Sequence, residues 1–259
     1  MTFGGKIMYA MITISLVAAT VASSLPAFAS NGDANAVIGQ PRQTALAETA
    51  LRLAAILNSE AIIIGDEKSD EKAAKLMAQL FGTNEEMKAA ESDYPGIGKE
   101  LADAVLPIIN GYMRARLPQL HETQAALYTR TFSSSELETL IAFYSSPTGQ
   151  KVIQLMIASL KPKAMLAEAQ ASEDFKITSS SALSDIRDTV PVILAGLGPE
   201  DQFVLEEFGR SGLVDRMKAV APETQTIALE WMAEYASGEE SETDMIVQAV
   251  FAKRENTAK

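Results

Sequence analysis

A nine-residue stretch, Phe143-Tyr144-Ser145-Ser146-Pro147-Thr148-Gly149-Gln150-Lys151, lies where one amphipathic helix is predicted to end and another to begin. Ser146 suits the N-cap of the second helix, because a serine hydroxyl accepts hydrogen bonds from the free N–H groups of a first turn. Pro147 then takes the first helical position, where its missing N–H costs nothing. Gly149 permits close packing in that turn. The stretch therefore predicts a tight helix–corner–helix.

The helix before this corner carries its own start signal. Ser133 and Glu136 have the spacing of a capping box, in which the serine caps the helix and the glutamate reaches back to the serine N–H. Phe132 and Leu137 occupy the two positions of the accompanying hydrophobic staple. The predicted buried stripe of this helix comprises Leu137, Leu140, Ile141 and Tyr144, with Phe143 widening it.

The corner and its flank return 65 positions later in altered form. The matching pairs are Glu136 and Asp201, Leu140 and Leu205, Phe143 and Phe208, Ser146 and Ser211, and Lys151 and Arg216. Ser133 falls on Gly198, which is also a permitted N-cap, and Pro199 follows it at the first helical position. Two different chemistries thus start a helix in the same register, which indicates an internal repeat. The alternative is a chance likeness between leucine-rich helices.

The rest of the chain reads as helix. Apolar residues recur every three or four positions, helix-forming residues dominate, and the alternation typical of strands is missing. We therefore predict an all-α fold, a bundle of about eight to ten short helices in two related halves. Pro107 is expected to kink a helix over 99–116, and Pro118 to start the next one. Other helices are expected over 41–64 and from Pro222, and Ser241 is expected to cap the last one.

The first 29 residues have the pattern of a secretory signal peptide. Lys6 is their only charge, the segment 8–22 is almost wholly apolar, and Ala27 and Ala29 stand at the −3 and −1 positions of a cleavage site. We expect cleavage near Ala29 and a periplasmic or secreted protein of the Gram-negative type, without a stable membrane anchor. The alternative is an uncleaved membrane anchor. The serines and threonines in the apolar run make that run short and weakly hydrophobic for a bilayer span.

The remaining parts follow from composition along the chain. They are a flexible leader at 30–40, a helical domain with the corner motif at 41–170, a candidate linker at 171–181, a second helical half that is a degenerate repeat at 182–254, and a frayed tail at 255–259.

Charge and composition exclude several classes of function. The formal net charge of −12 disfavours nucleic acid and anionic lipid as partners. The chain has no cysteine, hence no disulfide, no thiol nucleophile and no thiolate metal site. One histidine, His121, cannot build the common zinc or di-iron sites, which need two or more imidazoles. We predict no metal, no cofactor and no catalytic residue.

The corner itself allows two interpretations. Most of the motif has a structural explanation, which covers Phe132, Ser133, Glu136, Leu140, Phe143, Ser146, Pro147, Gly149 and the repeated Phe208. Gln150 and Lys151 are polar and have no capping duty in this register. Together with Tyr144 they form a candidate binding corner, on the interpretation that the three are exposed and meet a partner or ligand.

Other candidates are weaker. His121 with Glu122 could orient a general base, or be an ordinary histidine on a helix surface. Glu136 and Glu138 could flank a glycosidic bond, although two residues apart on a helix they point to different faces. Three aromatic residues could line a ligand groove or belong to the core: Trp231, Tyr235 and Phe251.

One family has the same signature. The pattern is Phe132-x-x-x-Glu136-Leu137-x-x-Leu140-x-x-Phe143-Tyr144-x-Ser146-Pro147-x-Gly149-Gln150-Lys151. It resembles an exported bacterial family catalogued as a domain of unknown function, DUF2059. The resemblance is sharp over 127–156, extends back to Ala45, and beyond Gln170 rests on the internal copy alone. It implies an all-helical exported protein without an assigned reaction, and it supplies no catalytic residues.

These observations lead to three hypotheses about function. The first is a non-enzymatic binding or structural protein of the cell envelope, whose groove between helical hairpins takes a protein, a peptide or a hydrophobic ligand. The second is a cell-envelope hydrolase that uses carboxylates with Tyr144 or His121. The third is self-assembly into a homo-oligomer through a helical face.

Overall fold

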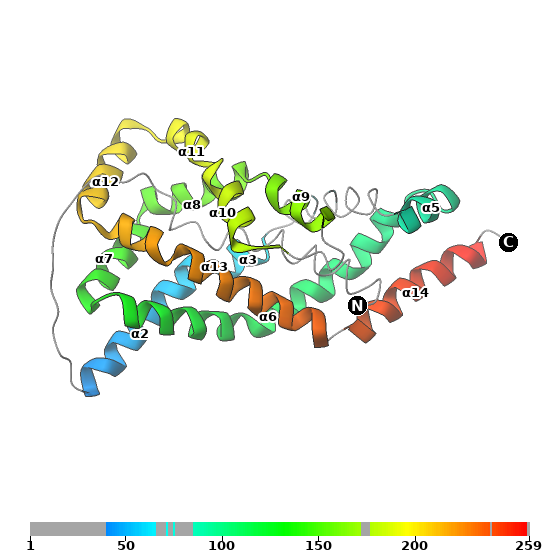
Figure 1. Cartoon of the computed structure of the whole chain (residues 1–259), viewed down its shortest axis with the longest axis horizontal. Helices are drawn as coiled ribbons and strands as arrows, with labels where there is room; N and C mark the ends of the chain where they lie inside the picture. The colour runs from blue at the N-terminus through cyan, green and yellow to red at the C-terminus, as the bar shows by residue number, and fades with distance from the viewer. Residues whose placement is uncertain are drawn as a thin grey trace.

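The computed structural model describes residues 40–65, 71, 75, 85–171, 177–238 and 240–257. Throughout this part of the chain the regular elements are helices, and none is a strand (Figure 1). This confirms the all-α prediction. The predicted signal peptide and nearly all of the predicted leader lie outside the described residues.

The described residues contain the following helices. In chain order they are α2 (Gln40–Leu57), α3 (Glu60–Ile63), α5 (Glu85–Asp93), α6 (Ile97–Thr131), α7 (Ser134–Ser145), α8 (Pro147–Ser159), α9 (Lys163–Ala171), α10 (Ser179–Arg187), α11 (Val190–Gly196), α12 (Pro199–Arg210), α13 (Leu213–Gly238) and α14 (Glu240–Thr257).

Helix α6 is the longest element, with 35 residues, and it contains both Pro107 and Pro118. The prediction that Pro118 begins a new helix is wrong. Each proline removes one backbone hydrogen bond, but Leu117 and Leu120 on either side of Pro118 are buried, and this packing holds the helix together. The helix changes direction along its length in Figure 1, as expected for a helix that contains proline.

Several predicted boundaries also differ. The helix expected over 41–64 is divided between α2 and α3, because Ser59 has extended backbone angles. Pro222 lies inside α13 and Ser241 inside α14, so neither starts its helix. Helices α9 and α10 reach into the candidate linker, and α14 continues to Thr257 in the tail expected to fray.

A single hydrophobic core joins the two predicted halves. Helix α2 packs against α6 and α7, α13 packs against α6 and α10, and α11 packs against α8. Tyr128 and Tyr144 are the largest fully buried side chains of this core. Helices α7 and α12 lie at the same end of the molecule in Figure 1. Among the helices of the described residues, none is long and apolar enough to span a bilayer.

Candidate functional site

The start of α7 has the local structure that the motif predicts. Ser133 is the N-cap, and its hydroxyl accepts a hydrogen bond from the Glu136 N–H. Glu136 Oε2 in turn accepts the Ser133 N–H at 2.8 Å. The capping box is therefore present as predicted. Both residues of the predicted staple, Phe132 and Leu137, are buried.

In the first corner, residues 133–151, the chain turns at a single residue. Ser146 has extended backbone angles, accepts the Gly149 N–H at 3.1 Å with its hydroxyl oxygen, and donates its hydroxyl to the Phe143 carbonyl at 2.7 Å. Pro147 begins α8, as predicted. A Cβ on Gly149 would lie 2.8 Å from Tyr144 Cα and still closer to the Phe143 carbonyl oxygen. The corner therefore requires glycine at this position.

Tyr144 does not lie on an exposed corner. Its side chain is fully buried, and burial raises the pKa of its hydroxyl, which therefore stays protonated. The binding-corner interpretation expects Tyr144 to be exposed together with Gln150 and Lys151. Tyr144 also belongs to the apolar stripe of α7, and that stripe determines its orientation. This part of the binding-corner interpretation is wrong.

Gln150 and Lys151 both have duties that the sequence did not reveal. The Gln150 side chain is exposed and donates from Nε2 to the Tyr144 carbonyl at 2.6 Å, so that it caps the C-terminal end of α7. Lys151 Nζ lies 2.6 Å from Asp201 Oδ2. Both residues therefore hold helices in place.

The second corner, residues 198–216, begins in the predicted register, but its chain turns differently from that of the first corner. Helix α12 has 12 residues, like α7, and starts 65 positions later. Asp201 Oδ2 accepts the N–H of the N-cap Gly198 at 3.1 Å, which reproduces half of a capping box. After α12 the chain turns through Gly212, whose φ is 74°, and α13 starts at Leu213.

The two corners are in direct contact. The rings of Phe143 and Phe208 are stacked, with centroids 3.8 Å apart and an interplanar angle of 2°. Arg216 of the second corner forms an ion pair with Glu136 of the first. The same guanidinium donates to the Thr131 carbonyl and lies 4.9 Å from the ring centroid of Phe132.

Two carboxyl groups, Glu136 and Asp201, form ion pairs between the corners, and both stay ionised. Burial would raise the pKa of Glu136, but the Ser133 N–H and hydroxyl together with Arg216 outweigh it and hold that pKa below its ordinary value. The hydrogen bond from Lys151 is the largest cause that lowers the pKa of Asp201, and Gly198 and Thr148 add to it. Neither carboxyl is suited to donate a proton near neutral pH.

A cluster of polar side chains between the end of α2 and α6 was not predicted from the sequence. Asn58 Nδ2 donates to Gln124 Oε1 at 2.7 Å, and the Tyr128 hydroxyl donates to the same oxygen at 3.3 Å. His121 Nε2 lies 2.8 Å from the Asn58 carbonyl oxygen. These contacts join the end of α2 to α6. A polar Gln124 between the buried Leu120 and Leu127 was the signal in the sequence.

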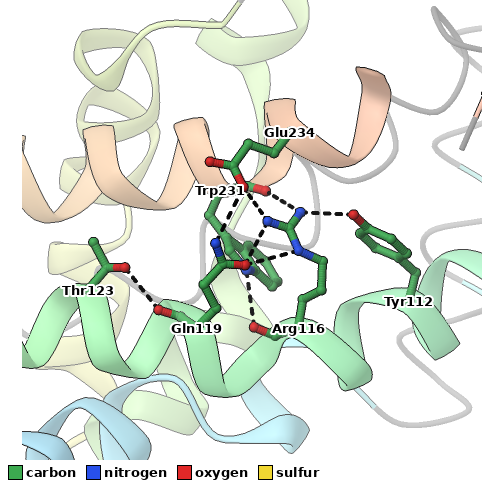
Figure 2. A network of polar contacts seen from close by, with 6 residues as sticks. All are labelled: Tyr112, Arg116, Gln119, Thr123, Trp231 and Glu234. Atoms are coloured by element: carbon green, nitrogen blue, oxygen red, sulfur yellow. Dashed lines mark hydrogen bonds and ion pairs between the residues drawn. The ribbon is translucent and has the colours of Figure 1, made fainter. Parts of the chain in front are cut away.

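A second polar network joins α6 to α13 (Figure 2). Trp231 Nε1 donates to the Arg116 carbonyl at 3.2 Å, and Arg116 Nη1 donates to the Trp231 carbonyl at 3.3 Å. Arg116 also pairs with Glu234 and lies 5.3 Å from the Tyr112 ring centroid. Trp231 is therefore part of the packing between two helices, as the core interpretation predicted.

The other candidate residues are dispersed. Phe251 is partly buried and packs edge-to-face on Tyr94, with centroids 6.3 Å apart. The side chain of Tyr235 lies outside the described residues. Glu138 faces away from Glu136 and pairs with Arg52 of α2 at 3.4 Å. In the ranges that the structure describes, no three acidic or histidine side chains are grouped so that they could hold a metal ion.

Comparison with known proteins places the motif in a family. Residues 118–173 match the DUF2059 family model. The family is described as an uncharacterized protein conserved in bacteria, and the matched segment runs from the second proline of α6 through α7, α8 and α9. The resemblance inferred from the motif is thereby confirmed for this segment. Neither a curated protein nor a solved structure gave a match.

Proposed function

We propose that this protein, whose residues 118–173 match the DUF2059 family model, is exported and acts in the cell envelope as a non-enzymatic binding or structural protein. The observation that carries the proposal is the use made of the motif's polar groups. Glu136, Ser146, Gln150 and Lys151 are each engaged in a cap or an ion pair within the fold. A motif used in this way builds a scaffold, and its polar groups are not directed at a substrate.

The chemistry of the strongest catalytic candidates supports the same choice. A general acid near neutral pH needs a raised pKa and access to substrate. Glu136 has a lowered pKa and is held by Ser133 and Arg216. Tyr144 is buried and its pKa is raised, so that it is poorly suited to serve as a base or a nucleophile.

Export is supported by the N-terminal sequence. A charged start, an apolar run and small residues before Ser30 have the order of a secretory signal peptide. The chain has no cysteine, so its fold needs no disulfide in an oxidising compartment, and its acidic composition favours solubility there. The partner class consistent with this proposal is a protein, a peptide or a hydrophobic ligand.

The deciding experiment combines capture with turnover. The purified mature chain would be used to capture partners from periplasmic extract, and would be assayed on cell-wall glycan and peptide. Glu136→Gln is compared with Glu138→Gln, which makes the same chemical change at an exposed pair on the other side of α7. We expect a specific captured partner, no turnover, and a lower melting temperature for Glu136→Gln alone.

The hydrolase alternative makes the opposite prediction. If wild-type protein turned over one of these substrates and Glu136→Gln abolished the turnover at an unchanged melting temperature, the scaffold proposal would be wrong. Self-assembly is tested by light scattering across a range of concentrations, since a homo-oligomer gives a molar mass above that of one chain, whereas a constant monomer mass rules it out.

A further inference from the structure

We propose that the motif corner is a self-complementary docking element whose partner is another copy of the same corner, and that this chain supplies that partner itself through residues 198–216. The first corner comprises residues 133–151 and the second corner residues 198–216. Two independent sets of contacts, between side chains and between helices, point to this conclusion.

The ion pairs between the corners are exchanged. The acid of the first corner, Glu136, meets the base of the second, Arg216, and the acid of the second, Asp201, meets the base of the first, Lys151. Asp201 is the residue 65 positions after Glu136, and Arg216 is the residue 65 positions after Lys151. Such reciprocal contacts are the mark of a twofold interface, where residue i contacts j and the copy of j contacts the copy of i.

The stacked aromatic rings lie where a twofold axis requires them. On such an axis a residue meets its own copy. Phe143 and Phe208 are 65 positions apart, and their rings are stacked almost parallel. One equivalent pair therefore contacts itself, whereas the two charged pairs exchange partners between the corners.

The helices follow the same exchange. Helix α8, which follows the first corner, packs against α11, which precedes the second. Helix α13, which follows the second corner, packs against α6, which precedes the first. Contacts at the end of α6 give this packing in detail, because Arg130 pairs with Glu223 and Arg216 donates to Thr131.

Three of the residues that form the contact have the same chemical type in both copies. Acid, aromatic ring and base are present at equivalent positions. Two further contacts are made by one copy only: Thr148 donates to Asp201 at 3.0 Å and the Tyr144 ring packs edge-to-face on Phe208. The equivalent residues are Leu213 and Gly209, so the reciprocal part of the contact consists of the two ion pairs and the stacked rings.

Charge-reversal cycles in the full chain test the proposal. The two cycles across the corners are Glu136→Lys with Arg216→Glu, and Asp201→Lys with Lys151→Glu. Each single reversal should raise the unfolding equilibrium constant. In each cycle, the double variant should lie about fivefold below the product of the two single effects, because it restores an opposite-charge pair. A twofold interface also requires that the two cycles give couplings that agree within about twofold.

The matched control cycles combine residues of one corner. They are Glu136→Lys with Lys151→Glu, and Asp201→Lys with Arg216→Glu. These pairs do not meet in the structure, so we expect their effects to multiply without recovery. Recovery within a corner, or in only one of the two cross-corner cycles, would contradict the proposal.

Neutral variants keep the test decisive if a reversed chain does not fold. Glu136→Gln with Arg216→Gln and Asp201→Asn with Lys151→Gln retain side chains that can still cap each helix. In addition, Phe143→Leu and Phe208→Leu should raise the unfolding equilibrium constant equally, and the double variant should raise it less than the product of both. Independent effects of the two phenylalanines would also overturn the proposal.

Discussion

The two corners form the same contact but turn in different ways. At the first, the chain reverses through Ser146 in an extended conformation, with Pro147 starting the next helix. At the second, it passes through Gly212 with a positive φ before α13 begins. The comparison teaches that two different chain paths can bring the same acid, aromatic ring and base into one reciprocal contact.

The outer faces of the two corner helices differ even more. Helix α7 lies against α2, and its Leu137 and Ile141 are buried. The equivalent residues of α12, Gln202 and Glu206, are exposed. Helix α12 packs against α8 and α13, and no helix of the described residues covers this face as α2 covers that of α7. The covering helix thus decides which of two equivalent faces is apolar.

The largest effect is expected from exchanging the two outer faces. Leu137→Gln should destabilise the protein by about 4 kcal/mol, since it removes a buried side chain and leaves an amide without a built partner. Gln202→Leu at the equivalent exposed position should cost only about 1 kcal/mol, the loss of the hydrogen bond from Gln202 Nε2 to the Leu197 carbonyl at 3.3 Å. Urea unfolding of both variants checks this, and similar losses in the two would contradict the assigned faces.

The next effect concerns the tight turn of the first corner. Gly149→Ala should destabilise by about 3 kcal/mol, because the added Cβ meets backbone that cannot move away. Val214→Ala at the equivalent buried position should cost only about 1–2 kcal/mol, the loss of two methyl groups. Thermal and urea unfolding measure both. If Gly149→Ala proved the milder change, the close approach at the first corner would be wrong.

A smaller effect separates the two turns. Gly212→Ala should cost about 1–2 kcal/mol, because a residue with a side chain must adopt a left-handed conformation there. Pro147→Ala at the equivalent position should cost about 0.5 kcal/mol, mainly through the added freedom of the unfolded chain. Midpoints of urea unfolding test the difference, and equal costs would argue that both corners turn alike.

The smallest expected effect is a change in pH dependence. The pKa values of Glu136 and Asp201 lie below their ordinary range in the folded protein. Their stabilisation is therefore fully present above the unfolded values of about 4 and is lost as the pH falls through the folded values. The variant Glu136→Gln with Asp201→Asn should lose less stability than wild type between pH 6 and pH 3.

Urea unfolding at a series of pH values provides that measurement. In the double variant, the slope of the unfolding free energy against pH should be reduced but not abolished, because the pKa values of Glu100 and Glu168 are lowered as well. A double variant with the wild-type profile would show that the corner acids do not contribute.

Much of the candidate site could be predicted from local pattern. The caps at Ser133 and Ser146 and the proline start at Pro147 were all predicted correctly. These features depend on contacts within about one helical turn, which sequence spacing displays directly. Boundaries that depend on distant packing were predicted less well. Pro118, inside α6, is the clearest case, because buried neighbours offset a lost hydrogen bond.

The partners of Lys151 and Glu136 could not be predicted, because the chain separates them widely. Lys151 meets Asp201 across 50 positions and Glu136 meets Arg216 across 80. No local rule selects one acid among the 34 in the chain. The burial of Tyr144 was equally hidden, since its place on the apolar stripe and its place in the motif favoured opposite orientations.

The sequence by itself determined the helical class, the register of the corner helices and the residues that start them, since each depends on neighbours within a few positions. Only the tertiary structure determined which acid pairs with which base, which outer face another helix covers, and whether the Tyr144 side chain is exposed. Those outcomes depend on α2, α12 and α13 arriving at the same place, and their approach is set by the packing of a shared core.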